Sequence, residues 1–266
     1  MTVFQAIVLG VVQGLSEFLP ISSSAHLTLT PWAFGWQDPG LDVDVALHLG
    51  TIIALVWFFW QEWVTLAGAA LEILKKRRVE TESERRVVWV AIATIPGALA
   101  GYLLQSYAKT VFRTPALVGA MLIVMGIILW AVDRAARQDR GLESMGWKDA
   151  LLIGLAQMFA IIPGVSRSGS TITGGRGLRF SRESAAVFSF LMSLPITTAA
   201  VVFEGRHAIR EGSMAPLIAG VLASAISGWL AIAVLLKYVA RHSYGVFALY
   251  RLVVGGAVLL LAALRG

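Results

Sequence analysis

Long uncharged apolar runs constrain this chain more than any other feature. Runs without a charged side chain cover residues 87–104, 114–132, 185–203 and 214–236, and two further apolar runs cover 45–60 and 244–264. A helix needs about 20 apolar residues to cross a bilayer, so we expect six transmembrane helices. Only 14% of the residues are charged, against about 25% in soluble domains. The sequence therefore predicts a single all-α polytopic membrane domain over residues 1–266.

Two apolar segments, 3–19 and 149–163, are shorter, and each runs into a proline and a serine-rich patch. Irregular backbone at membrane depth is tolerated only inside the protein or along a wet cavity. We therefore interpret the two segments as re-entrant helical hairpins whose turns lie inside the molecule.

These two segments resemble each other. Residues 9–25, LGVVQGLSEFLPISSSA, align at an offset of 144 with residues 153–169, IGLAQMFAIIPGVSRSG. The alignment matches Gly10 with Gly154, Gln13 with Gln157, Ser22 with Ser166, Ser24 with Ser168 and Ala25 with Gly169, whereas Pro20 and Pro163 are out of step by one. Three predicted spans separate the copies, so the second copy enters from the opposite side. This is an inverted-topology repeat, with residues 1–133 and 148–266 as its halves and both polar turns near the midplane.

The basic residues predict the orientation of the chain and explain its formal charge of +6 without a nucleic-acid partner. Fifteen lie on one side of the membrane, at positions 75–78, 85, 86, 134, 137, 140, 148, 176, 179, 182, 237 and 241. Five lie on the other side, namely Lys109, Arg113, Arg206, Arg210 and Arg265. Because cytoplasmic loops carry the excess of lysine and arginine, the first side is cytoplasmic and the first hairpin enters from outside.

Charges inside the hairpins mark the candidate site. A charge at the bilayer centre costs about 2.5–3.5 kcal/mol on insertion scales, so Glu17 and Arg167 are functional candidates. The forked guanidinium of Arg167 suits phosphate or carboxylate oxygens. Hydroxyls and backbone amides of both patches would help to hold an anion. The residues expected to bind phosphate with Arg167 are Ser22, Ser24, Ser166, Ser168, Gly169 and Thr171.

Three side chains beside the first turn are candidates for the chemistry on a phosphate-bearing molecule. Glu17 would bind a divalent cation or act as a base, His26 would move a proton, and Ser23 would attack phosphorus. The structural alternative is that the serines and glycines serve close helix packing and that Glu17 and Arg167 form only an ion pair.

QGLSEFLPISSSAHL at 13–27 and PGVSRSGSTIT at 163–173 resemble the two signature stretches of the bacterial undecaprenyl-diphosphate phosphatase family. This is the integral-membrane family linked to bacitracin resistance. DVALHLGT at 44–51 and SRESAAVFSFLMSLP at 181–195 resemble its flanking segments. The resemblance implies removal of the terminal phosphate from a C55 isoprenoid diphosphate, which regenerates the lipid carrier for cell-wall synthesis. It also implies a bacterial inner-membrane location, a site open to the periplasmic face, and a need for Mg²⁺ or Ca²⁺.

Carried over by position, the resemblance implies catalytic roles for Glu17, Ser23, His26 and Arg167. Its Glu/Gln-x-x-x-Glu motif falls on Gln13 and Glu17, which become the expected metal ligands. Many members have glutamate where this chain has Gln13. An amide oxygen can coordinate a metal but cannot act as a base, so Glu17 carries the acidic function. Attack by Ser23 is the preferred mechanism, with attack by water or by His26 left open.

A transporter or flippase for a polyprenyl phosphate is the alternative function, because inverted repeats with broken helices are the usual construction of secondary transporters. The expected partners are the polyprenyl diphosphate substrate and membrane lipids, with a homodimer left open. His48 either faces the site or serves helix packing. Arg251 is expected to snorkel to the membrane interface as an anchor.

Overall fold

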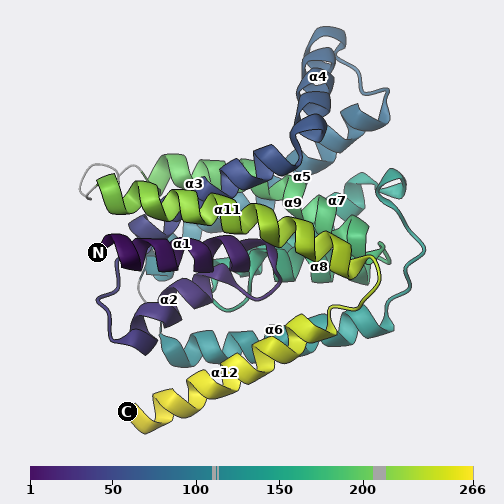
Figure 1. Cartoon of the computed structure of the whole chain (residues 1–266). Helices are drawn as coiled ribbons and strands as arrows, with labels where there is room; N and C mark the ends of the chain where they lie inside the picture. Colours follow the sequence, from purple (N-terminus) through teal and green to yellow (C-terminus); the bar gives the residue numbers. More distant parts are fainter. Residues whose placement is uncertain (110–111, 113, 206–213, 266) are drawn as a thin grey trace.

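Helices make up most of this computed structural model, which describes residues 1–109, 112, 114–205 and 214–265. The first half contains α1 (Val3–Phe18), α2 (Ser23–Phe34), α3 (Leu41–Phe58), α4 (Trp60–Lys76), α5 (Glu82–Lys109) and α6 (Pro115–Ala135) (Figure 1). The second half contains η2 (Leu142–Ser144), α7 (Trp147–Met158), η3 (Phe159–Ile161), α8 (Arg167–Gly177), α9 (Arg182–Ala200), η4 (Val201–Gly205), α11 (Met214–Val239) and α12 (Gly245–Arg265). Arg113, Arg206 and Arg210, three of the five basic residues predicted on the outer side, lie outside the described residues.

Five helices of the described chain are long and apolar enough to cross a membrane. They are Glu82–Leu104, Pro115–Ala135, Arg182–Phe203, Met214–Val239 and Gly245–Leu264, which match five of the predicted spans. The remaining predicted span, 45–60, lies mainly on α3, which bends by 85° into α4. The described chain thus has five candidate spans, or six with one contributed by the bent pair, and the predicted all-α polytopic membrane fold is confirmed. The sequence pattern did not predict α4 as a separate helix.

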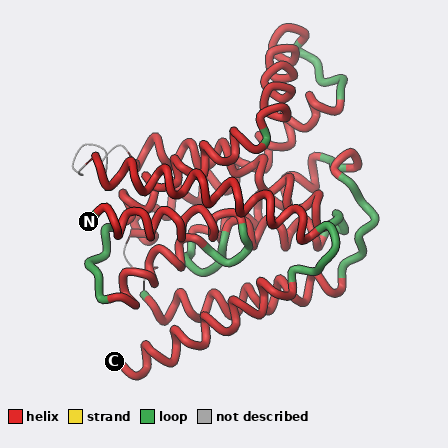
Figure 2. The backbone as a smooth tube through the Cα atoms, viewed as in Figure 1, coloured by secondary structure: helices red, strands yellow, loops and turns green. Residues whose placement is uncertain are grey.

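Each of the two shorter apolar segments forms a helix, a break and a second helix. α1 ends at Phe18 and α2 begins at Ser23, whereas η3 ends at Ile161 and α8 begins at Arg167. Both breaks are loop segments inside the helical body (Figure 2), and the two hairpins enter that body from opposite ends (Figure 1). A proline in each break lacks the N–H group that a continuing helix would need.

The matched serines Ser22 and Ser166 build the same turn in the two hairpins. Their φ angles are 77° and 73°, a conformation that costs a non-glycine residue of order 1–3 kcal/mol. The hydroxyl of Ser22 accepts from the backbone N–H of Ala25 at 3.4 Å, and that of Ser166 from the N–H of Gly169 at 3.0 Å. Each serine thus caps the helix that follows. This agreement is what two related halves would give; the boundaries 1–133 and 148–266 stay a prediction.

Each hairpin packs against a helix from the other half of the chain. A Cβ atom on Gly10 of α1 would collide with the backbone of Gly220 in α11, and one on the matched Gly154 of α7 would collide with the backbone of Ala93 in α5. Small residues allow this close approach of helices in a membrane. The halves are therefore interlocked, which holds both turns in the interior.

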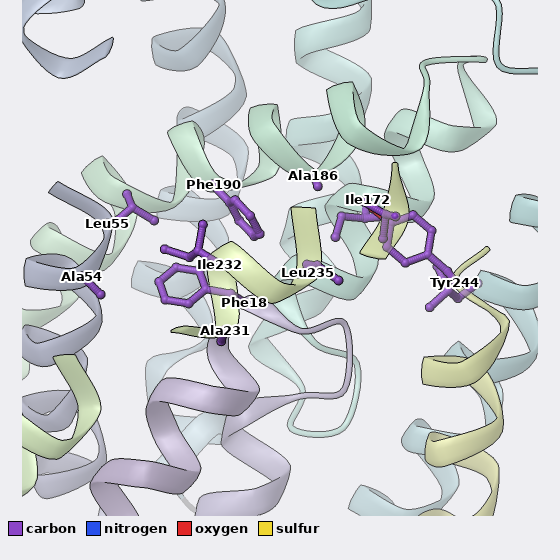
Figure 3. Packing of buried hydrophobic residues seen from close by; sticks show 12 residues of the cluster. Phe18, Ala54, Leu55, Ile172, Ala186, Phe190, Ala231, Ile232, Leu235 and Tyr244 are labelled. Carbon is purple, nitrogen blue, oxygen red and sulfur yellow. The ribbon is translucent and has the colours of Figure 1, made fainter. Parts of the chain in front are cut away.

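A hydrophobic core lies directly beside the two turns (Figure 3). It includes Phe18 from the end of α1, Ile172 from α8, Phe190 from α9 and Ile232 from α11, all at most 1% exposed. The rings of Phe18 and Phe190 meet edge to face with centroids 5.3 Å apart. Because Phe18 follows Glu17 and Ile172 lies on the helix that begins at Arg167, this core fixes the two hairpins relative to each other.

Arg176 was counted among the basic residues on the cytoplasmic side, but it is not a loop residue. It is a buried residue of α8. Its Nε donates to Asp133 at 2.8 Å, and the Nε of Arg182 donates to the same carboxylate at 2.9 Å. The backbone N–H of Tyr244 donates to the other Asp133 oxygen at 3.0 Å. Asp133 thus ties the end of α8 to α6, α9 and the start of α12.

Candidate functional site

Glu17, buried in the last turn of α1, is the point on which four helices converge. Its Oε2 accepts hydrogen bonds from Gln13 Nε2 at 3.0 Å and from Ser23 Oγ at 2.5 Å, and it lies 3.3 Å from His48 Nε2. Its Oε1 accepts from Nη2 of Arg167. The sequence predicted Gln13, Ser23 and Arg167 near Glu17, and the structure brings all three together from α1, α2 and α8.

The two turns are in direct contact, as the inverted arrangement predicted. The backbone N–H of Gly164 donates to the hydroxyl of Ser22 at 3.1 Å. In the other direction, the hydroxyl of Ser168 donates to the backbone carbonyl of Leu19 at 3.1 Å. These bonds place Arg167, the first residue of α8, beside the end of α1.

Two buried atoms at this site have no hydrogen-bond partner within the described residues, namely Nη1 of Arg167 and Oε1 of Gln13. Buried polar atoms are usually satisfied, so an exception at a charged cluster points to a ligand. Nη1 can donate only to an acceptor such as a phosphate oxygen, whereas Oε1 can accept a hydrogen bond or coordinate a cation. A purely structural ion pair between Arg167 and Glu17 does not account for these two atoms.

The contact between Ser23 and Glu17 has the geometry of a nucleophile and its base. The serine hydroxyl donates to the carboxylate at 2.5 Å, within the reach that proton transfer requires. Arg167 and Gln13 bind the same carboxylate and fix its orientation. A hydroxyl that is paired with a base in this way can be activated for attack.

His26 lies one turn into α2 and points toward α12. Its Nδ1 lies 2.7 Å from the carbonyl oxygen of Ser22, and its Nε2 lies 2.8 Å from the hydroxyl of Tyr250. The two rings are stacked, with centroids 5.6 Å apart. In the described part of the chain, His26 makes no hydrogen bond to Glu17, Ser23 or Arg167. Tyr250, which the sequence argument did not single out, is therefore its nearest polar side-chain partner.

The hydroxyls that the sequence assigns to phosphate binding make bonds within the protein. Ser22 and Ser166 cap α2 and α8, and the hydroxyl oxygens of Ser24 and Ser168 lie 3.2 Å from them, respectively. Thr171 donates to the carbonyl oxygen of Arg167 at 2.8 Å and lies 2.7 Å from Ser189 Oγ. The N–H of Gly169 is taken by the cap at Ser166. These bonds shape the turns, and phosphate binding by these residues stays a prediction.

His48 faces the site, a choice that the sequence left open. The Nδ1 atom of the imidazole lies 2.8 Å from the carbonyl oxygen of Asp44, one turn earlier in α3. This contact directs Nε2 toward Glu17. A histidine in an otherwise apolar span was the available signal, because a polar ring at membrane depth needs partners.

Arg251 was wrongly predicted to be an interface anchor, because its side chain is 0% exposed. It donates to the carbonyl oxygens of Pro20, Gly164 and Val165 at 3.0, 2.6 and 3.0 Å, and to that of Leu122 at 3.2 Å. The broken helices leave the carbonyls of Pro20, Gly164 and Val165 without intrahelical donors, and a buried carbonyl must be satisfied inside the protein. Arg251 therefore clamps the two turns together.

With this geometry established, comparison with known proteins decides the family. The profile of a family described as "Bacitracin resistance protein BacA" matches residues 6–257. The chain belongs to this family.

Relatives of this BacA family member match along the whole chain. A protein of Gemmatimonas aurantiaca is 56% identical over 266 residues, which are 100% of both chains. One of Pelotomaculum thermopropionicum is 54% identical over 265 residues, covering 100% of this chain and 98% of the relative. One of Moorella thermoacetica is 47% identical over 266 residues, again 100% of both chains. Each of the three is named undecaprenyl-diphosphatase.

Proposed function

We propose that this multi-pass membrane protein hydrolyses undecaprenyl diphosphate to undecaprenyl phosphate and inorganic phosphate. This reaction recycles the lipid carrier of cell-wall synthesis and confers resistance to bacitracin. Membership of the BacA family and full-length similarity to proteins named undecaprenyl-diphosphatase support the assignment. The structural observation that best supports it is that Ser23 and Arg167 both donate hydrogen bonds to the buried carboxylate of Glu17.

In the proposed reaction, Oγ of Ser23 attacks the terminal phosphorus while Glu17 takes the hydroxyl proton. The bond from that phosphorus to the bridging oxygen breaks, and undecaprenyl phosphate leaves. Water then hydrolyses the phosphoserine and releases inorganic phosphate. Nη1 of Arg167 donates to the transferred phosphoryl group, where a preorganised cation stabilises the transition state. His26, held by Tyr250, is assigned the proton transfers of the second step.

Gln13 and Glu17 suit a divalent cation, Mg²⁺ or Ca²⁺, because both offer oxygen ligands and Oε1 of Gln13 lacks a hydrogen-bond partner in the described chain. No group of three or more His, Cys, Asp or Glu side chains forms a metal site among the described residues. The diphosphate would complete the coordination, as substrate phosphates do at many Mg²⁺ sites. The bound cation would neutralise charge on the phosphoryl oxygens.

We place the protein in the bacterial inner membrane with its site open to the periplasmic face, in accord with the distribution of basic residues. The isoprenoid tail stays in the bilayer while the diphosphate reaches Arg167 between helices. Membrane lipids and the substrate are then the partners, and light scattering of the purified protein tests whether it forms a homodimer.

The test is phosphate release from a short-chain prenyl diphosphate by purified protein in detergent. Release with Mg²⁺ or Ca²⁺, its loss with chelator, and phosphoserine trapped at Ser23 by acid quenching are expected. A Ser23→Ala protein that still turns over would redirect the mechanism to water or His26. Absence of release from a folded protein, together with movement of labelled polyprenyl phosphate across vesicles, would replace the phosphatase with the transporter.

A further inference from the structure

Helix α4 leaves the direction of the spanning helices. It follows α3 after a bend of 85°, and it projects away from the helical body together with the start of α5 (Figure 1). Since α3 lies alongside α1 and the spanning helix α11, a helix at nearly a right angle to it runs roughly in the plane of the membrane.

One side of α4 is packed within the protein. Leu66 and Ala69 are buried at 6% and 8% exposure, and Leu66 shares a hydrophobic cluster with Val90 and Ala93 of α5. A second side is polar and exposed, with Gln61 and Thr65 near its centre. These two sides leave a third side of the helix, which is neither packed within the protein nor polar.

The third side is an exposed apolar stripe made of Trp60, Val64, Leu71 and Leu74. The four residues are 61%, 54%, 57% and 73% exposed. Their spacings of four, seven and three positions put them on one line of a helix with about 3.6 residues per turn. Because α4 is nearly perpendicular to the spanning helices and the rest of this chain leaves the stripe exposed, another apolar surface must cover it.

Basic residues follow the stripe at the end of α4. Lys75, Lys76, Arg77 and Arg78 are consecutive, and Lys75 is 71% exposed. Glu72, Glu80 and Glu84 pair with three of them, yet residues 72–86 still contain six basic against four acidic side chains. An apolar stripe that ends in excess positive charge is typical of a helix lying in the headgroup region of a bilayer.

We propose that α4 is an interfacial helix that binds the surface of the protein's own membrane. Trp60, Val64, Leu71 and Leu74 insert between lipids, and the segment 75–78 contacts headgroup phosphates on the face that the basic loops make cytoplasmic. Trp60, at the junction with the spanning helix, takes the position that tryptophan favours at a membrane interface. The helix would thus fix the depth of α3, which carries His48.

The absence of cysteine in the chain allows a direct test by single nitroxide labels. Leu71→Cys reports on the stripe, Thr65→Cys on the polar side, and Val234→Cys, 63% exposed on α11, on a lipid-facing span. Labelled protein is placed in vesicles of phosphatidylcholine with phosphatidylglycerol, and collisions with oxygen and with a water-soluble nickel chelate are measured. At residue 71 the ratio of oxygen to nickel collisions should approach that at residue 234 and exceed that at residue 65.

A ratio at residue 71 equal to that at residue 65 would overturn the proposal. So would spin–spin broadening at residue 71 that disappears on dilution with unlabelled protein, because a second copy would then cover the stripe. Replacing residues 75–78 by glutamine should lower the ratio at residue 71 in vesicles containing phosphatidylglycerol and leave it unchanged in pure phosphatidylcholine. If the glutamine variant keeps the original ratio at residue 71 in vesicles containing phosphatidylglycerol as well, residues 75–78 do not contact the headgroups. Unchanged phosphate release by every variant in detergent, where no bilayer positions α4, shows that the fold is intact.

Discussion

The two re-entrant turns share a backbone and differ in chemistry. Ser22 and Ser166 adopt the same left-handed conformation and cap the following helix in the same way. At other matched positions the side chains diverge: Glu17 is opposite Ile161, and Ser23 is opposite Arg167. The serine turn is therefore a scaffold present twice, and the proposed reaction needs one contribution from each copy.

Gln13 and Gln157 show the same divergence with an identical side chain. Gln13 Nε2 donates to Glu17 at 3.0 Å, whereas Gln157 Nε2 donates to the backbone carbonyl of Ala93 at 3.4 Å. Each keeps a buried Oε1 without a hydrogen-bond partner in the described residues. Only the first amide lies beside a carboxylate, so only the first is placed to share a cation.

The largest effect on activity should come from breaking the contact between Glu17 of the first hairpin and Arg167 of the second. Arg167→Ala should lower kcat by at least about two orders of magnitude, as loss of one preorganised donor does elsewhere, and Glu17→Gln should be nearly as damaging. Phosphate release by purified variants of equal thermal stability measures this. Ile161→Gln, at the position matched to Glu17, is the control and should retain most activity. Equal losses at residues 17 and 161 would mean that activity responds to any change in the packing of the turns, and the loss at Glu17 would then not locate the chemistry.

A smaller loss is expected at His48, which has no counterpart in either turn. His48→Ala should lower kcat/KM about tenfold or more, because a hydrogen bond to a charged group is worth about 1.5–3 kcal/mol. His48→Gln keeps a donor near Glu17 and should recover part of the activity. Steady-state kinetics of the two variants decide the matter: if they lose activity equally, packing of α3 and not the contact with Glu17 explains the effect.

The shared scaffold predicts a loss of stability at both serines, larger at Ser22. Ser22→Ala and Ser166→Ala each remove a helix cap, worth about 1 kcal/mol, and each leave alanine at a positive φ, but Ser22→Ala also leaves the buried N–H of Gly164 without its acceptor. Thermal unfolding in detergent should show a lower midpoint for both variants, with the larger drop for Ser22→Ala. A drop confined to Ser22→Ala would show that the second turn is held by other contacts, with the bonds from Arg251 to Gly164 and Val165 as the candidates.

Apolar runs predicted the spans because burial in lipid needs a continuous stretch of about 20 residues. The motif residues Gln13, Glu17, Ser23 and Arg167 were predictable because polar groups at membrane depth are costly and need partners. Arg251 was not, since its partners are backbone carbonyls of distant turns, which leave no side-chain pattern in the sequence. The helix α4 was missed because the 85° bend occurs without a proline or glycine at Phe59.

The smallest effect should separate the two glutamines. Gln13→Glu places a second carboxylate beside Glu17, where a divalent cation would bind both, so activity should be retained while half-maximal release needs less Mg²⁺. Gln157→Leu removes an amide whose Oε1 has no hydrogen-bond partner in the described chain and should leave the cation dependence unchanged. Titration of phosphate release with Mg²⁺ compares the two. A Gln13→Glu protein that needs as much Mg²⁺ as the wild type, or more, for half-maximal release would place the cation away from α1, because a carboxylate binds Mg²⁺ more strongly than an amide oxygen does.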